Sequence, residues 1–413
     1  MGFEDLENKP ASGSPYFTPA QEPPAGTPLK NDSAPTLFKP LRVRGVELKN
    51  RFVVSPMCTY SAENGHLTDW HLVHLGQFAL KGAGLVFVEA TAVEPQGRNG
   101  PEDSGLWEDS QIVPLKRITD FIHSQNSKVA IQLAHTGRKA NTLAPWIGGS
   151  ANKTLVPKEL GGWPDEIVAP SAIPFAEGYG TPHELTTEEI KTQVKKWQDA
   201  AVRAVKAGFD VIEFHAAHGY LIHEFLSPHT NKRTDQYGGS FENRTRFLFE
   251  IIEAVRNVVP DDLPLWVRIS GTEWMEWAGE PSWDLESSIR LAKQLPAAGV
   301  DVLDVSSAGN LPEQKIHVHQ TFQADLAGKI REALRADGKE LLVATVGLIT
   351  DGAFASSLVQ EDKGPKADLV LAARQFLREP DFVLSAAEEL NVGVKWPVQY
   401  QRAPPKHRQL LHK

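Results

Sequence analysis

The chain has 413 residues, of which 41% are hydrophobic and 23% are charged, and its formal net charge is −9. These proportions are typical of a globular protein, and the acidic balance argues against a nucleic-acid or anionic-membrane partner, because both need a basic face. A single cysteine, Cys58, excludes an intramolecular disulfide and a four-thiolate iron–sulfur cluster.

Residues 1–35 are rich in proline and glycine and lack the basic start and apolar stretch of a secretory signal. Because proline interrupts regular structure, the sequence predicts a flexible N-terminal arm here. No apolar run approaches the roughly 20 residues of a membrane span, and we expect a cytoplasmic protein. Residues 37–50 have the pattern of a short hairpin that turns at Gly45 and caps one end of the fold.

Eight apolar runs recur along the rest of the chain, and each is followed by a segment with helical spacing. The runs are 51–57, 84–93, 128–135, 209–217, 264–270, 301–307, 341–347 and 368–374. Near-continuous apolar strands separated by helices are typical of a parallel sheet covered on both faces. Eight such units predict an α/β fold, a single (β/α)₈ TIM barrel with an N-terminal hairpin cap and an extended N-terminal arm.

Polar residues collect at the carboxyl ends of these runs, where the active site of such a barrel lies. Burying them costs free energy unless they meet partners or a ligand. They include Ser55, Tyr60, Glu89, Gln132, His135, Arg138, His215, His218, Arg268, Ser306 and Arg374. The link at 136–185 is long and rich in glycine, proline and tryptophan, which is typical of a functional loop or lid.

The sharpest local feature is the sequence His215-Ala216-Ala217-His218 at the end of the fourth run. Residues i and i+3 face the same way if the chain curls helically after the strand. Two adjacent imidazoles can then donate hydrogen bonds to one oxygen, which polarises a carbonyl group and stabilises an enolate-like charge. Alternatively, one histidine is a packed residue of the barrel rim, or both bind a metal together with His223 and His229.

Charged and glycine residues at three other strands indicate an anionic ligand. Arg268 lies inside an apolar run, where an unpaired charge is costly, so it must face an anion or form an internal ion pair. It would suit the negative charge of a reduced flavin. Gly347 and Arg374 follow the seventh and eighth runs, where many barrels bind phosphate. Tyr220 lies two residues past His218 and is either a proton donor or a packing residue.

Taken together, these segments resemble the old yellow enzymes, the NAD(P)H:flavin oxidoreductase family, over roughly residues 36–402. The most specific stretches are NRFVVSPMCTYSAENG (50–65), EATAVEPQGR (89–98), IQLAHTGRKA (131–140), FDVIEFHAAHGYLIHEFLSP (209–228) and NKRTDQYGGSFENR (231–244). The segment SPMCTY resembles the class III, thermophilic-like ene-reductase subgroup, in which a cysteine follows the SPM motif.

The resemblance implies an FMN-binding barrel over 36–413, with NADPH or NADH as the hydride donor. FMN would contact Ser55, Pro56, Met57, Cys58, Ala90, Gln132 and Arg268, and its phosphate would lie against Gly347, Ala373 and Arg374. His215 and His218 would bind the substrate oxygen, Tyr220 would donate a proton, Cys58 would tune the flavin and Tyr60 would touch the substrate. Arg402, in a C-terminal tail, would reach a neighbouring subunit of a homodimer or homotetramer.

The implied activity is the reduction of a C=C bond conjugated to a carbonyl or nitro group, by hydride transfer from flavin N5 and protonation by Tyr220. Two departures affect this expectation. Ala372-Ala373 stands where the family has a glycine before the arginine, and tryptophans at 146, 163, 277 and 283 put the substrate preference in doubt.

Other hypotheses remain at this stage. Dienoyl-CoA reductases and amine dehydrogenases of the same family need an iron–sulfur cluster and further domains, which the single cysteine argues against. A metal-dependent barrel hydrolase would use His215, His218 and His223. A flavin-binding barrel that has lost catalysis would not need to keep both histidines and Tyr220.

Overall fold

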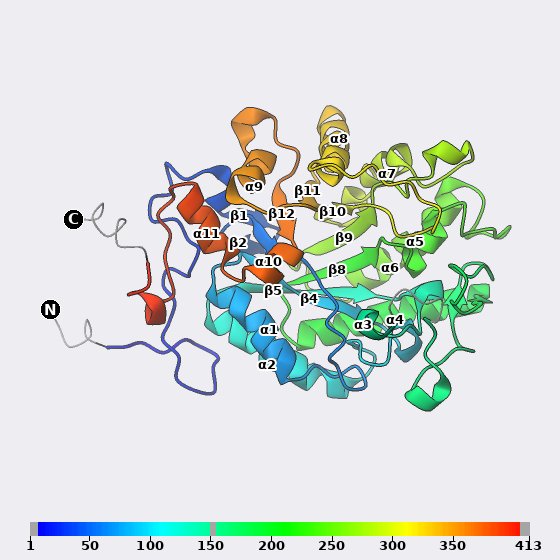
Figure 1. Ribbon diagram of the computed structural model, residues 1–413, viewed down its shortest axis with the longest axis horizontal. Coiled ribbons are helices and arrows are strands. Elements are labelled where there is room, and N and C mark those ends of the chain that lie inside the picture. The colour runs from blue at the N-terminus through cyan, green and yellow to red at the C-terminus, as the bar shows by residue number, and fades with distance from the viewer. Residues whose placement is uncertain (1–6, 149–153, 405–413) are drawn as a thin grey trace.

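The computed structural model describes residues 7–148 and 154–404, and its centre is a closed barrel of eight parallel strands (Figure 1). In order around the barrel they are β3 (Phe52–Val54), β4 (Leu85–Ala92), β5 (Lys128–Ala134), β8 (Val211–Ala216), β9 (Leu265–Ser270), β10 (Val302–Ser306), β11 (Leu342–Val346) and β12 (Leu369–Ala372). Each lies within one of the eight predicted runs, so the predicted TIM barrel is confirmed.

Helices cover the outside of the barrel. Those that connect successive strands are α1 (Asp69–Leu80), α2 (Ile112–Ser124), α4 (Thr187–Lys206), α6 (Phe241–Arg256), α7 (Leu285–Ala292), α8 (Phe322–Ala336) and α9 (Gly352–Val359). Shorter or terminal helices are α3 (Pro145–Gly148), α5 (Leu221–Leu226), α10 (Arg374–Arg378) and α11 (Phe382–Glu389). No helix in the described ranges is long and apolar enough to cross a membrane.

Helix α4 illustrates why these segments fold as they do. The Thr186 hydroxyl accepts a hydrogen bond from the Glu189 backbone N–H at 3.2 Å, and the Glu189 carboxylate accepts one from the Thr186 N–H at 2.8 Å. This capping box satisfies donors that a helix otherwise leaves unpaired. Ile190, Trp197 and Ala201 recur at helical spacing and are fully buried against the barrel.

The predicted hairpin is also confirmed, and it plugs the amino-terminal end of the barrel. Strands β1 (Leu41–Val43) and β2 (Val46–Leu48) pair antiparallel around a turn at Arg44 and Gly45. Their buried side chains join an apolar cluster inside the barrel, formed by Val43, Val46, Leu48, Val53, Leu85, Phe87, Ala130, Val211, Trp266, Val302, Ala344, Leu369 and Leu371. This end of the interior is therefore solid, and an internal cavity can open only toward the other end.

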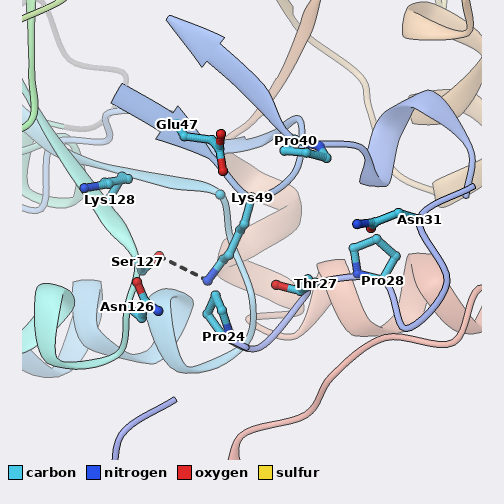
Figure 2. A pocket seen from close by; sticks show the side chains of 11 residues that line it. Pro24, Thr27, Pro28, Asn31, Pro40, Glu47, Lys49, Asn126, Ser127 and Lys128 are labelled. Atoms are coloured by element: carbon cyan, nitrogen blue, oxygen red, sulfur yellow. Dashed lines mark hydrogen bonds between the residues drawn. The ribbon is translucent and has the colours of Figure 1, made fainter. Parts of the chain in front are cut away.

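The described part of the N-terminal arm lies on the barrel beside the C-terminal segment (Figure 1). Gly26 N–H donates to Lys395 O at 2.9 Å, and Lys395 N–H donates to Thr27 O at 2.8 Å. Between arm and hairpin lies a small cavity of about 280 Å³, where the Lys49 amine reaches Ser127 Oγ at 3.4 Å (Figure 2). The mobility predicted for residues 1–35 stays a prediction.

The link at 136–185 contains little regular structure, as its composition indicated. It holds α3 and two short strands, β6 (Val168–Ala169) and β7 (His183–Glu184), which pair in parallel. The described parts of this link pack over the carboxyl ends of the barrel strands through Arg138, whose guanidinium donates to Asn310 O at 2.6 Å. The link thus builds one wall above the barrel.

Asn50 ties the arm to the barrel, and this contact generates a prediction. Its fully buried amide donates to Gly26 O at 3.2 Å and to Gly82 O at 2.9 Å. We expect Asn50→Ala to lower the free energy of unfolding by about 1–3 kcal/mol, because it leaves both buried carbonyl oxygens without this donor. Urea unfolding would measure this free energy, and Glu47→Gln, a change at an exposed position of the hairpin, would serve as the control. Equal midpoints for the two variants would contradict the role of Asn50.

Candidate functional site

A cavity of about 590 Å³ opens at the carboxyl end of the barrel strands. Seven of the residues predicted to bind the cofactor or the substrate line it, namely Ser55, Pro56, His218, Arg268, Gly347, Ala373 and Arg374. They come from β3, β8, β9, β11 and β12 or from the loops that follow, so distant parts of the sequence meet here because parallel strands end at the same edge. Its volume is that of a small-molecule or cofactor site.

One end of the cavity has the features of a phosphate site. Gly347 has a φ of +115°, and a Cβ at this position would lie 2.4 Å from Gln323 Nε2, so only glycine fits the turn. Arg374 and Arg378 line the same cavity with exposed guanidinium groups. Neither forms an ion pair within the described part of the chain. Two uncompensated cations beside a close backbone approach suit a phosphate group.

Arg268 lies at the floor of the cavity and is held by a buried polar network. Its Nε donates to the Asp304 carboxylate, and its Nη2 donates to Ser55 Oγ at 2.9 Å. Glu213 Oε1 is 3.7 Å from Arg268 Nε and accepts a hydrogen bond from Gln132 Nε2 at 2.8 Å. The arginine therefore does both things that the sequence left open: it forms internal ion pairs, and it lines the cavity.

The two carboxyl groups in this network do not both carry a full charge. Burial and the neighbouring Asp304 carboxylate raise the pKa of Glu213 to about 8, against the opposing effect of Arg268. Burial also raises the pKa of Asp304, while the two carboxylates raise the pKa of Arg268. The raised pKa thus favours the protonated form of Glu213 at neutral pH, while the guanidinium stays charged under the cavity.

The two histidines of the His-Ala-Ala-His motif lie side by side, with ring centroids 5.1 Å apart. The turn that brings them together is not the helical curl expected from the spacing. His215 is the last residue but one of β8, and His218, two residues past the strand end, adopts the left-handed region with a φ of +60°. Gly219 follows at a φ of +74° and packs so closely on Gly309 that a Cβ would lie 2.3 Å from its carbonyl oxygen.

Several hydrogen bonds hold His218 in this strained conformation. Its N–H donates to Ser270 Oγ at 2.9 Å, and its carbonyl oxygen accepts from the Lys139 amine at 2.9 Å. Its Nε2 lies 2.7 Å from Ser306 Oγ. For His215, Nδ1 accepts from the Ala217 N–H at 3.2 Å, so the ring proton is on Nε2.

Both histidines are neutral at physiological pH. Burial lowers the pKa of His215 well below its ordinary value, and the proximity of His218 lowers it further. Burial and Arg268 likewise lower the pKa of His218, although its side chain is open to the cavity. A neutral imidazole can donate one N–H hydrogen bond to a ligand oxygen without bringing a charge into the site.

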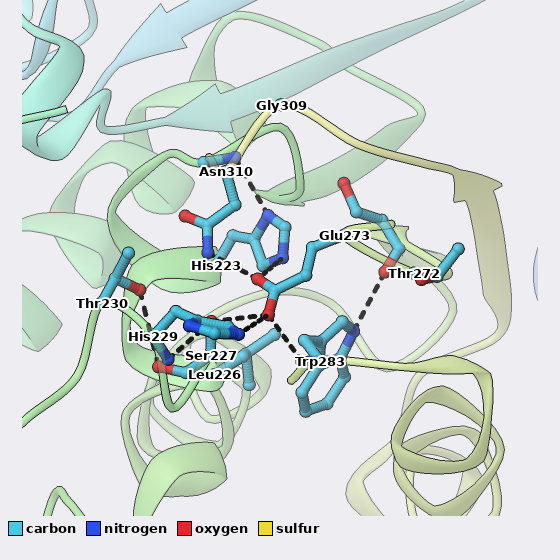
Figure 3. Close-up of polar contacts among 12 residues, drawn as sticks. His223, Leu226, Ser227, His229, Thr230, Thr272, Glu273, Trp283, Gly309 and Asn310 are labelled. Carbon is cyan, nitrogen blue, oxygen red and sulfur yellow. Dashed lines mark hydrogen bonds and ion pairs between the residues drawn. The ribbon is translucent and has the colours of Figure 1, made fainter. Parts of the chain in front are cut away.

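His223 does not join the other two histidines, which argues against the metal-hydrolase hypothesis. Its Nδ1 accepts from the Gly219 N–H at 2.9 Å, and its Nε2 faces Glu273 at 4.0 Å (Figure 3). Glu273 is buried and accepts from Ser227, Asn310 and Trp283 (Figure 3). Within the described ranges, no three His, Cys, Asp or Glu side chains are placed to hold a metal ion. His223 instead supports the turn after His218.

Tyr220, Cys58 and Tyr60 form a second group beside the histidines. The Tyr220 ring lies 4.7 Å from the His215 ring, and its hydroxyl donates to Asn99 Oδ1 at 2.8 Å. Asn99 Nδ2 is 3.7 Å from Cys58 Sγ. The Tyr60 ring packs edge-on against the ring of Trp146 in the 136–185 link, with ring centroids 5.6 Å apart. Burial raises the pKa of both Tyr220 and Cys58, so the phenol and the thiol stay protonated.

A β-bulge in β4 explains the place of Ala90. The pairing of β4 with β5 shifts between Val88 and Ala90, which sets Ala90 opposite Gln132. Glu89 is thereby free to accept hydrogen bonds from the Thr59 N–H at 3.3 Å and from the Thr59 hydroxyl at 2.7 Å. The bulge thus anchors the segment that carries Cys58 and Tyr60.

Two predicted residues lie apart from this cluster. Met57 is half-buried and packs against the apolar core, next to Pro56 of the cavity wall. Arg402 is exposed and lies in the C-terminal tail, just after the short turn Val398–Tyr400. That tail contacts the N-terminal arm, where Gln21 Nε2 donates to Gln399 Oε1 at 2.9 Å.

The sequence interpretation missed four residues that shape the site. Glu213 and Asp304 are charged residues inside apolar runs, the same signal that identified Arg268, and they could have been found. Asn99 and Lys139 lie in loops and carry no such signal. Their roles depend on which other segments these loops contact in the folded chain, and the local sequence does not indicate this.

Comparison with known proteins agrees with this geometry. Residues 36–392 match the model of the NADH:flavin oxidoreductase / NADH oxidase family. An NADH:flavin oxidoreductase from Gibberella zeae is 47% identical over 404 residues, covering 96% of this chain and 95% of the relative. An NADPH dehydrogenase from Bacillus velezensis is 46% identical, covering 89% of this chain and 98% of its own.

Solved structures show the same architecture. Morphinone reductase is 27% identical with a TM-score of 0.67, over 89% of this chain and 92% of that one. A 2-naphthoyl-CoA reductase is 28% identical with a TM-score of 0.74 over 86% of this chain, which spans 52% of that longer chain. This chain therefore belongs to the NADH:flavin oxidoreductase / NADH oxidase family, the old yellow enzymes, and is an NAD(P)H-dependent flavin oxidoreductase that uses FMN.

Proposed function

We propose that the enzyme is an ene-reductase, which reduces the C=C bond of α,β-unsaturated carbonyl or nitro compounds. The observation that carries this proposal is the pair of neutral imidazoles, with ring centroids 5.1 Å apart, and the Tyr220 ring 4.7 Å from the His215 ring. Two hydrogen-bond donors suit an oxygen on which charge develops, and a protonated phenol suits a carbon that must gain a proton.

The residues of the cavity fit FMN. Gly347, Ala373 and Arg374 line the cavity and would hold the phosphate, and Ser55, Pro56 and Arg268 line it and would contact the ring system. Met57, Cys58, Ala90 and Gln132 lie outside its lining, and we propose them as further contacts of the ring. Arg268 stays charged beside Asp304 and Glu213, so it would stabilise the negative charge of the reduced ring. When bound and reduced by NADPH or NADH, FMN supplies a hydride from N5 to the substrate β-carbon.

The chain's own residues orient the substrate and handle the proton. His215 donates from Nε2, since its Nδ1 is already an acceptor. His218 donates from Nδ1 when Ser306 donates to its Nε2. Together they would hold the carbonyl or nitro oxygen and draw charge onto it. Tyr220 would then transfer its phenolic proton to the α-carbon, and Tyr60 would contact the substrate.

We also propose that the enzyme is a homodimer or homotetramer in which Arg402 serves a neighbouring site. Its exposed guanidinium group and its position at the end of the tail support this role. The related structure of morphinone reductase in complex with tetrahydroNAD supports a nicotinamide as the hydride donor.

Replacing either histidine tests the proposed role of the pair. We expect His215→Ala or His218→Ala to slow reoxidation of the reduced enzyme by cyclohexenone about a hundredfold, because one oxyanion donor contributes about 3 kcal/mol to barrier lowering. Stopped-flow absorbance at the flavin band would measure the rate. His66→Ala is a matched control, since it also removes a histidine, and His66 forms a hydrogen bond with Ser110 in a surface loop that does not line the cavity. A wild-type rate in either site variant would contradict the anchoring role.

The pH dependence of the same step follows from the electrostatics. Lowered pKa values keep His215 and His218 neutral above strongly acidic pH, and the raised pKa of Tyr220 keeps its proton at neutral pH. We therefore expect a flat rate profile for cyclohexenone between about pH 5.5 and 7.5. Asp103, whose pKa burial raises to about 6, could produce a limb in the same range, so a limb near pH 6.5 that persists in Asp103→Asn would show that a histidine titrates in the site.

A further inference from the structure

Asn99 joins two groups of the site through one side chain. It lies in the loop after the short turn Pro95–Gly97, and only 7% of its surface is exposed. Its Oδ1 accepts from the Tyr220 hydroxyl at 2.8 Å, and its Nδ2 donates to Cys58 Sγ at 3.7 Å. The carboxamide therefore bridges the proposed proton donor and the thiol beside the cofactor site.

The loop backbone holds this bridge in place. The Asn99 N–H donates to the Asp103 carboxylate at 2.6 Å, and the Asn99 carbonyl oxygen accepts from the Thr142 N–H at 2.5 Å and from its hydroxyl at 3.2 Å. Asp103 is buried and also accepts from the Gly100 N–H. With both sides of its backbone fixed, the side chain is left to move mainly by rotation of its amide.

Such a rotation leaves both Tyr220 and Cys58 with a hydrogen-bond partner. A primary amide has an acceptor at one end and two donors at the other. Burial raises the pKa of Cys58, so the thiol keeps its proton and can either accept from Nδ2 or donate to Oδ1. Tyr220 is a donor as a phenol and a strong acceptor as a phenolate. A half-turn of the Asn99 amide therefore exchanges its hydrogen bonds to Tyr220 and Cys58 for the opposite pair, at the cost of its side-chain interaction with the Asp103 carboxyl group.

We propose that Asn99 is a positioning residue for Tyr220 that serves the phenol before proton transfer and the phenolate after it. This inference rests on the proposed function. The Tyr220 O–H bond breaks and a C–H bond forms at the substrate α-carbon, while the O–H electron pair stays on the phenolate oxygen. Asn99 then turns its Nδ2 donors to that oxygen, and Cys58 donates its S–H to Oδ1. Water returns the proton before the next cycle.

The test compares two electron acceptors on the same reduced enzyme. Cyclohexenone needs a proton at carbon, whereas ferricyanide takes single electrons and needs none. We expect Asn99→Leu to slow reoxidation by cyclohexenone about tenfold or more, within the range of general acid catalysis, and to leave the ferricyanide rate within about twofold of wild type. The unchanged ferricyanide rate would show that the cofactor site is intact.

A double-variant cycle asks whether Asn99 acts through Tyr220. We expect Tyr220→Phe and Tyr220→Phe/Asn99→Leu to have the same cyclohexenone rate, because the partner of a missing hydroxyl has no further effect. Additive losses would overturn the proposal, since they would show that Asn99 acts independently of the phenol.

Asn99→Asp separates the two hydrogen-bonding roles. Because aspartate and asparagine are similar in size, this variant also provides the test if the leucine variant does not fold. At pH 8 an ionised carboxylate keeps the acceptor for the phenol but offers no donor to the phenolate. We expect this variant to be as slow with cyclohexenone as Asn99→Leu, whereas a wild-type rate would overturn the proposed rotation. Thr142→Val is the matched control, because it removes only the hydroxyl contact to the Asn99 carbonyl, and it should keep the wild-type rate.

These outcomes are distinct from failure of the proposed function. If reduced wild-type enzyme is reoxidised by ferricyanide but not by cyclohexenone, the ene-reductase proposal fails, and the role of Asn99 fails with it. If wild type reduces cyclohexenone and Asn99→Leu does so equally fast, the proposed function stands and only the inference about Asn99 is overturned.

Discussion

The buried guanidinium group of Arg268 is the constraint on which the rest of this site depends. A charge enclosed by a barrel is costly unless charged partners surround it, and here the partners are Asp304 on one neighbouring strand and Glu213 on the other. Their presence divides the barrel interior into two halves. The half toward the hairpin is packed with apolar side chains, and the half toward the strand ends is polar and opens into the cavity.

Around this floor the site is built by loops that are held rigidly. The strained His218 turn is fixed by Ser270, Lys139 and the His223–Glu273 cluster, and the Cys58–Tyr60 segment is fixed by Glu89. Strain of this kind persists only where surrounding contacts compensate for it. Hydrogen-bond donors placed before the substrate arrives need no reorganisation when charge develops, which is the main source of electrostatic catalysis.

Much of the fold could be predicted because its signals are local. Eight apolar runs and a turn at Gly45 identify the barrel strands and the hairpin, since strand ends and tight turns depend on residues that are adjacent in sequence. Arg268 and Gly347 were also identifiable, because a charge inside a strand and a glycine after one are each unusual. The resemblance to the family added the roles expected of the two histidines and of Tyr220.

The remainder depends on contacts between distant segments. The left-handed turn at His218 needs Lys139, Ser270 and Gly309 to stabilise it, and none of these is near it in sequence. The bulge at Glu89 depends on the register of β4 against β5. Asn99 meets Tyr220 across 121 positions of the chain, so only the folded loops reveal the pair.

The most direct test of the central claim is an anaerobic absorbance titration of the purified wild-type protein. The account predicts a yellow protein that is bleached by NADPH or NADH and regains its colour when cyclohexenone is added, with one equivalent of saturated ketone formed. Bleaching without recovery on adding cyclohexenone or a nitroalkene would contradict the ene-reductase assignment. A colourless protein that does not take up FMN would contradict the assignment of the cavity itself.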